Sequence, residues 1–225
     1  MRRELLAPVL AVIGGAIVLV IALVVANQLG GGHSSKPVGL SGIPQKGIEL
    51  GSPTAKLTMV EFSDPQCPFC GDWARHVFPT LVQKYVRTGK LRMEYAGLAF
   101  LGTDSTSLLD LAQAAGLQNK LWNVVELEFE RQGTENSGYA TDAFLKGIVK
   151  AVPGLNADKA LSAANTNAVV PMINAARTLA ETKVGNQIST PTFLIGPTGS
   201  TRTETIVGDQ PLSTFTKAID AQLKK

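Results

Sequence analysis

The sequence has very little cysteine and histidine for its length. Its 225 residues include only two cysteines, Cys67 and Cys70, and two histidines, His33 and His76. A structural zinc site takes four protein ligands, so the cysteine pair would need about two more than the sequence offers nearby. The pair is also too closely spaced to join distant parts of a fold, as the several disulfides of small secreted scaffolds do. We therefore expect no metal and no bound cofactor, and a chemical role for the two sulfurs.

Charge of one sign is scarce as well. The formal net charge is +3, and no run of lysine or arginine is longer than two residues. Domains that bind nucleic acids carry a basic patch or stripe, and basic interaction tails carry longer runs. No nucleic-acid partner is expected. The hydrophobic share of 44% is large enough for a sizeable core.

One long apolar run, from Leu5 to Val25, lies near the N-terminus. Its 21 residues correspond to about 30 Å of helix, the thickness of the hydrocarbon core of a bilayer. Two arginines precede the run, whereas the next cation along the chain is Lys36. The positive-inside rule then leaves the N-terminus in the cytoplasm. We predict a single-pass membrane anchor over residues 1–26 and an extracytoplasmic remainder. The alternative is a signal peptide cleaved before Asn27, which also exports the domain.

The rest of the chain divides into a linker and one α/β domain. Residues 27–46 are rich in Gly, Ser and Pro and lack a hydrophobic period, which indicates a flexible linker. The domain is expected over residues 47–225, with a helical insertion at about 103–185. The predicted elements are a strand at 57–62, a helix from 67 kinked at Pro79, a strand at 91–96, helices over 103–184 with N-caps at Thr141 and Asn156, strands at 192–195 and 203–207, and a final helix from Pro211.

The cysteine pair lies where a strand ends and a helix begins. In Cys67-Pro68-Phe69-Cys70 the first sulfur is placed at the helix N-terminus, among free N–H groups and the positive end of the dipole. Both favour the thiolate of Cys67 and lower its pKa. Pro68 suits the first helical position, and Cys70, one turn inside, would be the buried, resolving thiol. The alternative is an inert structural disulfide.

Two segments of the sequence resemble the DsbA-like disulfide oxidoreductases of the thioredoxin superfamily. One is the run from Leu57 to Cys70, which reads LTMVEFSDPQCPFC, and the other is the run from Ser189 to Phe193, which reads STPTF. The resemblance covers about residues 47–225 and implies a thioredoxin-like fold with a helical insertion. It implies that Pro191 is cis and packs beside the cysteines, and that Thr190 presents its backbone to a substrate strand.

The resemblance also bears on residues around the pair. The best-known members have histidine where this chain has Phe69, so the strength of the oxidant is open. Pro68 and Phe69 are expected at the substrate surface. The family has a buried acid at the position of Glu61, which assists proton movement; the alternative is a solvated glutamate, and its charge partner would be Arg92 or Glu94. Asp64 is interpreted as a turn residue, His76 as a solvated helix residue, and Trp73 and Trp122 as core or groove wall.

These observations favour an exported protein-disulfide oxidoreductase that forms disulfides in client proteins through Cys67 and Cys70. The resemblance implies a membrane partner that reoxidises the pair. Two rivals stay open: a reductase or isomerase, and a membrane-tethered, chaperone-like binding module whose disulfide is structural.

Overall fold

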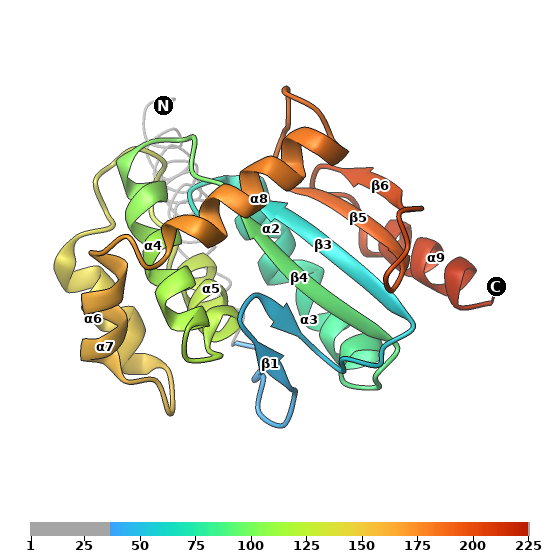
Figure 1. The fold of residues 1–225 in the computed structure, drawn as a ribbon, viewed down its shortest axis with the longest axis horizontal. Coiled ribbons are helices and arrows are strands. Elements are labelled where there is room, and N and C mark those ends of the chain that lie inside the picture. Colours follow the sequence, from blue (N-terminus) through green and yellow to red (C-terminus); the bar gives the residue numbers. More distant parts are fainter. Residues whose placement is uncertain (1–36, 225) are drawn as a thin grey trace, which may run out of the picture. The chain divides into compact units, whose positions relative to one another are not determined.

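The structure, a computed structural model, describes residues 37–224. These residues form a six-stranded sheet in the order β1-β2-β4-β3-β5-β6 (Figure 1). The central strands β3 (Leu57–Ser63) and β4 (Leu91–Gly97) run parallel, as a strand–helix–strand unit requires. All other neighbours pair antiparallel. The remaining strands are β1 (Gln45–Lys46), β2 (Glu49–Leu50), β5 (Thr192–Pro197) and β6 (Glu204–Val207).

Helices cover both faces of this sheet. Helices α2 (Pro68–His76), α3 (Phe78–Leu81) and α9 (Leu212–Leu223) lie on one face, and α8 (Val170–Lys183) crosses the other (Figure 1). Successive strand residues point to opposite faces. Odd-numbered β3 residues therefore enter the core under α2, while Phe62 joins a smaller cluster with Ala176 and Ala180 of α8.

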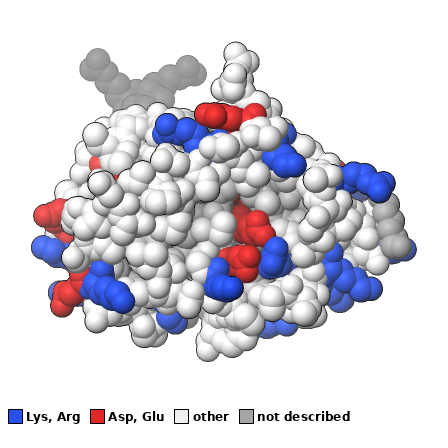
Figure 2. Space-filling model, in the orientation of Figure 1, with Lys and Arg blue, Asp and Glu red and all other residues white. Residues whose placement is uncertain are grey.

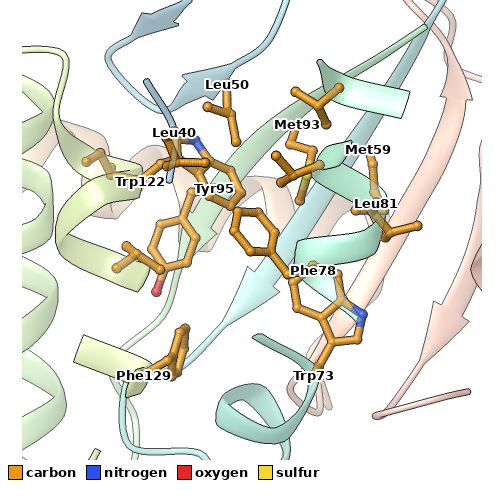
Figure 3. Close-up of a cluster of buried hydrophobic side chains, with 14 of the residues drawn as sticks. Leu40, Leu50, Met59, Trp73, Phe78, Leu81, Met93, Tyr95, Trp122 and Phe129 are labelled. Carbon is orange, nitrogen blue, oxygen red and sulfur yellow. The ribbon is translucent and has the colours of Figure 1, made fainter. Parts of the chain in front are cut away.

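Aromatic rings fill the core between the sheet, α2 and α5 (Leu121–Glu130) (Figure 3). Trp73 lies with its ring centre 4.5 Å from that of Phe193, and Phe78 stacks on Trp122 at 5.5 Å. Rings of this size bury more apolar area than any other side chain. Both tryptophans are thus core residues, and Trp122 Nε1 also donates to the carbonyl of Ile48 at 2.8 Å.

The helix after the cysteines is broken rather than only kinked. Helix α2 ends at His76, α3 starts at Phe78, and a π-helical turn η1 (Val82–Val86) follows. Pro79 has no N–H to continue the α2 ladder, and its ring excludes the carbonyl one turn back. The break lets α3 and η1 follow the sheet while α2 keeps Cys67 at its start.

The insertion between β4 and β5 is helical from 103 to 183, as the sequence predicts. It contains α4 (Thr103–Gly116), α5, α6 (Asp142–Ala151), α7 (Ala157–Ala164) and α8. Both predicted N-caps are confirmed, because Thr141 Oγ1 accepts from Phe144 N at 3.2 Å and Asn156 Oδ1 accepts from Lys159 N at 2.9 Å.

The predicted linker is wrong in its second half. Leu40 and Ile43 are buried in the main core, and residues 45–46 form β1. The domain therefore includes residues before 47, because the apolar side chains of Leu40 and Ile43 are part of its core. Among residues 37–224, no helix is long and apolar enough to cross a membrane. The predicted span over residues 5–25 lies outside the described residues.

The face of the sheet that carries α8 has mixed charge. Figure 2 shows basic and acidic side chains scattered over this side of the molecule, with no extended area of one sign. Arg92 of β4 bridges Glu94 at 2.7 Å and Glu49 at 3.5 Å. This surface agrees with the small net charge.

Candidate active site

The turn between β3 and α2 is fixed by one buried carboxylate. Asp64 Oδ1 accepts from the N–H of Gln66 at 2.9 Å and from the hydroxyl of Ser105 at 2.6 Å. Its Oδ2 accepts from the N–H groups of Phe100 and Leu101 at 2.9 and 3.2 Å. Asp64 is therefore more than the turn residue that the sequence predicts, because it joins the active-site turn to the β4–α4 loop and to α4.

The turn places Cys67 at the N-cap of α2, with Pro68 in the first helical turn. The Cys67 side chain is 5% exposed, whereas that of Cys70 is completely buried, and both are free thiols. Pro68 and Phe69 project outward between them, and Phe69 is 61% exposed. The first sulfur thus lies just below the surface with a small accessible area, and the second lies fully inside.

The two sulfurs have opposite electrostatic surroundings. A hydrogen bond from the Cys70 thiol is the largest cause that lowers the pKa of Cys67, to about 6, against the opposing effect of burial. The side chain of Thr190 and the backbone N–H groups of Cys70 and Phe69 lower it further. Burial raises the pKa of Cys70 well above its ordinary value, and the hydrogen bond to Cys67 and the nearby charge of that sulfur add to this.

The loop before β5 forms the other wall of the site. The bond between Thr190 and Pro191 is cis, as the resemblance implies, and Pro191 is buried. The Cys67 thiol donates to the carbonyl of Thr190 at 3.3 Å. The loop is held from both sides, because Thr192 Oγ1 donates to Ser189 O at 2.6 Å and Gly208 N donates to Pro191 O at 2.8 Å.

Glu61 lies on β3 under the cysteine pair and is 1% exposed. Burial raises its pKa to about 8. Neither charge partner that the sequence suggests is available: Arg92 binds Glu94 and Glu49 on the α8 face, whereas Glu61 aligns with Tyr95 and points to the opposite face. The carboxyl group is therefore held in its protonated form at neutral pH by the absence of water around it.

Two glutamines complete the site, and neither was predicted from the sequence. Gln132, just after α5, donates through Nε2 to the carbonyls of Pro65 and Cys67 at 2.9 and 3.0 Å. Gln66 donates to Ser105 Oγ at 2.9 Å and accepts from Asn136 N at 2.7 Å. The helical insertion therefore holds the turn that carries the first sulfur.

Other predicted residues lie outside this chemistry. His76 is exposed on α2, where Nδ1 is 2.9 Å from the carbonyl oxygen of Asp72. Across residues 37–224, no three His, Cys, Asp or Glu side chains gather so that they could hold a metal ion. The residues that the structure brings together are Glu61, Cys67, Pro68, Phe69, Cys70, Thr190 and Pro191.

Comparison with known proteins decides the family. A family model described as Thioredoxin matches residues 44–221. The chain belongs to the thioredoxin family. The chain is also similar to the probable disulfide bond formation protein D of Bacillus anthracis, with 32% identity over 107 residues, which are 45% of this chain and 48% of the relative. The disulfide bond formation protein D of Bacillus subtilis is 25% identical over 103 residues, 45% of this chain and 46% of that protein. The aligned part thus spans about half the length of these curated relatives.

Solved structures show the same thioredoxin-like fold with a helical insertion. Oxidised BdbD from Bacillus subtilis superposes with a TM-score of 0.70 at 18% identity, covering 81% of this chain and 98% of that one. Alpha-DsbA1 from Wolbachia pipientis gives 0.67 at 23% identity, covering 83% and 93%. At such identities the likeness shows the fold, and the chemistry depends on the site described above.

Proposed function

We propose that the protein is a thiol–disulfide oxidoreductase that forms disulfides in proteins outside the cytoplasmic membrane. The difference between the two sulfurs carries this proposal: Cys67 is the more accessible sulfur and has a pKa of about 6, and Cys70 is completely buried and has a raised pKa. An inert disulfide needs no such difference. The relatives named as disulfide bond formation proteins support the same conclusion.

The first step opens the oxidised pair. A client thiolate attacks Sγ of Cys67, the sulfur at the surface, so that a client–Cys67 disulfide forms and the bond to Cys70 breaks. The electron pair passes to Cys70 Sγ, which takes up a proton because its buried position disfavours the anion. The carbonyl of Thr190, beside Cys67 Sγ, offers the backbone acceptor along which an extended client segment would lie.

The second step releases the product. A second client thiolate attacks the client sulfur of the mixed disulfide, the client gains its disulfide, and Cys67 leaves as a thiolate. A sulfur with a low pKa is a good leaving group. The protein is now reduced by two electrons, and a membrane partner would accept these electrons and restore the disulfide.

The low pKa of Cys67 favours oxidation of clients over their reduction. With a pKa of about 6, about ten thiolates exist per thiol at pH 7. Compared with a thiol whose pKa is 9.0, this stabilises the reduced protein by about 1.4 kcal/mol, which is worth about 30 mV. The oxidised form is therefore a stronger oxidant than it would be if the pKa of Cys67 were 9.0.

The location rests on the apolar run over residues 5–25 and the arginines before it. A single-pass anchor would hold the domain at the outer membrane surface, close to newly exported clients and to a membrane oxidant. Retention in the membrane fraction after carbonate washing, with protease access to residues from 47 onward, tests this location. A mature form that starts near Asn27 and stays out of the membrane fraction would contradict the anchor.

Client trapping tests the activity itself. Cys70→Ser should accumulate mixed disulfides with clients, because the resolving thiol is gone, and Cys67→Ser should accumulate almost none. The variants differ by one atom each and serve as controls for one another. Equal trapping by both would contradict the assigned roles. If neither variant traps clients and both keep their activity, the cysteine pair is structural, and a tethered, chaperone-like binding module is the better explanation.

A further inference from the structure

The buried carboxyl group of Glu61 needs a route to solvent if it exchanges protons with Cys70. Glu61 is 1% exposed, and within the described part of the chain neither of its oxygens has a hydrogen-bond partner. The hydroxyl of Ser63 lies near the Glu61 carboxyl group and the Cys70 thiol, and it lowers the pKa of each. Ser63 Oγ forms no hydrogen bond of normal geometry with either group. Each catalytic cycle of the proposed function would change the charge on this carboxyl group, and no proton can reach it directly from water.

A small cavity adjoins Glu61, and neither cysteine lines it. Its volume is about 10 Å³, close to the least that holds one water molecule. Apart from Glu61, the side chains around it come from α2, α3 and α5, and Figure 3 shows the aromatic ones close together. The lining residues are Glu61, Trp73, Ala74, Phe78, Trp122, Val125, Glu126 and Phe129. The two carboxyl groups are the only ionisable groups of this lining.

Glu126 also lines a second, open cavity of about 570 Å³ on the outer side of α5. Pro37, residues 39–43, Gln45 and the side of α5 that carries Asn123, Glu126 and Leu127 border this outer cavity. Glu126 therefore lines both cavities, the small one next to Glu61 and the large one open to water. Its oxygen Oε1 accepts the N–H of Val38, which fixes the side chain in this wall.

We propose that Glu126 passes protons between solvent and Glu61 through the small cavity, and that it acts on the sulfurs only through Glu61. This inference rests on the proposed oxidoreductase function. It assigns to Glu126 a proton-transfer role that depends on the two cavities it joins.

In the direction of client oxidation, one proton moves inward from solvent to Cys70. When the Cys67–Cys70 bond breaks, the electron pair goes to Cys70 Sγ, and Glu61 gives this sulfur its proton. The Glu61 carboxylate then takes a proton from Glu126 across the cavity, and the Glu126 carboxylate takes one from water in the outer cavity. In reoxidation the same proton moves outward, from Cys70 to Glu61 to Glu126 to water.

The charges around Glu126 suit this role. Burial raises its pKa to about 7, the N–H of Val38 lowers it, and the negative charge of Glu130 raises it. Lys120 borders the outer cavity, and Tyr95 is aligned with Glu61 on the sheet. Both forms of Glu126 are therefore populated near neutral pH, as a group that accepts and gives protons there requires.

Single-turnover reduction of the oxidised protein by a reduced dithiol peptide tests the proposal. Glu126→Gln keeps an acceptor for Val38 N but cannot carry the proton, so the rate should fall at least about tenfold and show a larger solvent isotope effect in D2O. Glu126→Ala should be slow and regain rate with added formate, and Glu126→Asp should stay nearer wild type. The pKa of Cys67 should not move in any of them.

Glu181→Gln is the control, because it removes a carboxyl group from an exposed position on α8 and lines neither cavity. It should react at the wild-type rate. If Glu126→Gln matches wild type in rate and isotope effect while Glu61→Gln is slow, the proton route is wrong and the oxidoreductase stands. If the wild-type protein forms no mixed disulfide with the peptide, the proposed function fails first.

Discussion

The two sulfurs of the redox pair lie in opposite surroundings, one near the surface and one inside the core. At the surface end, Cys67 faces N–H groups and a thiol that favour the anion, and its pKa is about 6. At the inner end, Cys70 and Glu61 lie among aromatic side chains, and burial raises the pKa of both. One helical turn separates the sulfurs. The comparison shows that position relative to the start of α2 and to the sheet, rather than residue type, decides which group is charged.

Glu61→Gln should give the largest change at the inner end. The folded protein keeps the proton of Glu61 up to about pH 8, whereas the unfolded chain loses it near 4.5. Stability therefore falls by about 1.4 kcal/mol per pH unit across this interval, as the folded state must hold a proton that the unfolded state has released. We expect the variant to gain about 4 kcal/mol at pH 8 and almost nothing at pH 4.

Urea denaturation at the two pH values measures this difference. Glu94→Gln is the control, since Glu94 lies on the neighbouring strand but pairs with Arg92 at 2.7 Å on the other face. That variant should lose about 1 kcal/mol or less at both pH values. A Glu61→Gln variant that gains nothing between pH 4 and pH 8 would show that the carboxyl group is solvated or paired.

The next largest effect should come from the hydrogen bonds that join the helical insertion to the turn before α2. Gln132→Ala removes hydrogen bonds to the carbonyls of Pro65 and Cys67 and should cost about 1–3 kcal/mol. Gly71→Ala should act on the same contact, because a Cβ there would lie 2.2 Å from Gln132 Oε1 and force that side chain away.

The double variant with Gly71→Ala and Gln132→Ala tests whether both substitutions act through the same side chain. If both substitutions act through Gln132, their free energies of unfolding should be far from additive, with the double variant close to the worse single one. Chemical denaturation of the four proteins of this cycle measures the coupling. Simple additivity would mean that Gly71 and Gln132 act separately.

Phe69→His should have the smallest effect. Phe69 is 61% exposed between the sulfurs and offers Cys67 only its backbone N–H. A histidine there adds a donor for the thiolate, so the reduction potential should rise by about 30 mV, equivalent to about 1.4 kcal/mol. The wild-type potential should be more negative than the roughly −120 mV of the strongest oxidant of this kind. Equilibration with glutathione measures both, and an unchanged potential would refute the argument.

The local parts of this account could be predicted from the sequence. The strand before Cys67, the helix after it and the caps at Thr141 and Asn156 depend on residues a few positions apart, and all are found. The position of Cys70 one turn inside the helix follows from the same spacing.

The contacts that hold the site together could not be predicted in this way. Gln132 reaches Cys67 across 65 positions of sequence, and Asp64 reaches Ser105 across 41. Leu40 is buried by a core formed much later in the chain. The position of Glu126 in the lining of two cavities likewise depends on how α5 packs against β3 and residues 37–43. Such contacts depend on the tertiary fold, which no short window of sequence specifies.

The rate of alkylation of each cysteine in the reduced protein, followed as a function of pH, tests the roles assigned to the two sulfurs. Iodoacetamide labelling followed by peptide mass spectrometry reports the two sulfurs separately. Cys67 should react first, with a transition at about pH 6, and Cys70 should stay unlabelled through neutral pH. Labelling of Cys70 first, or a Cys67 transition near the free-cysteine value of about 8.5, would contradict these roles.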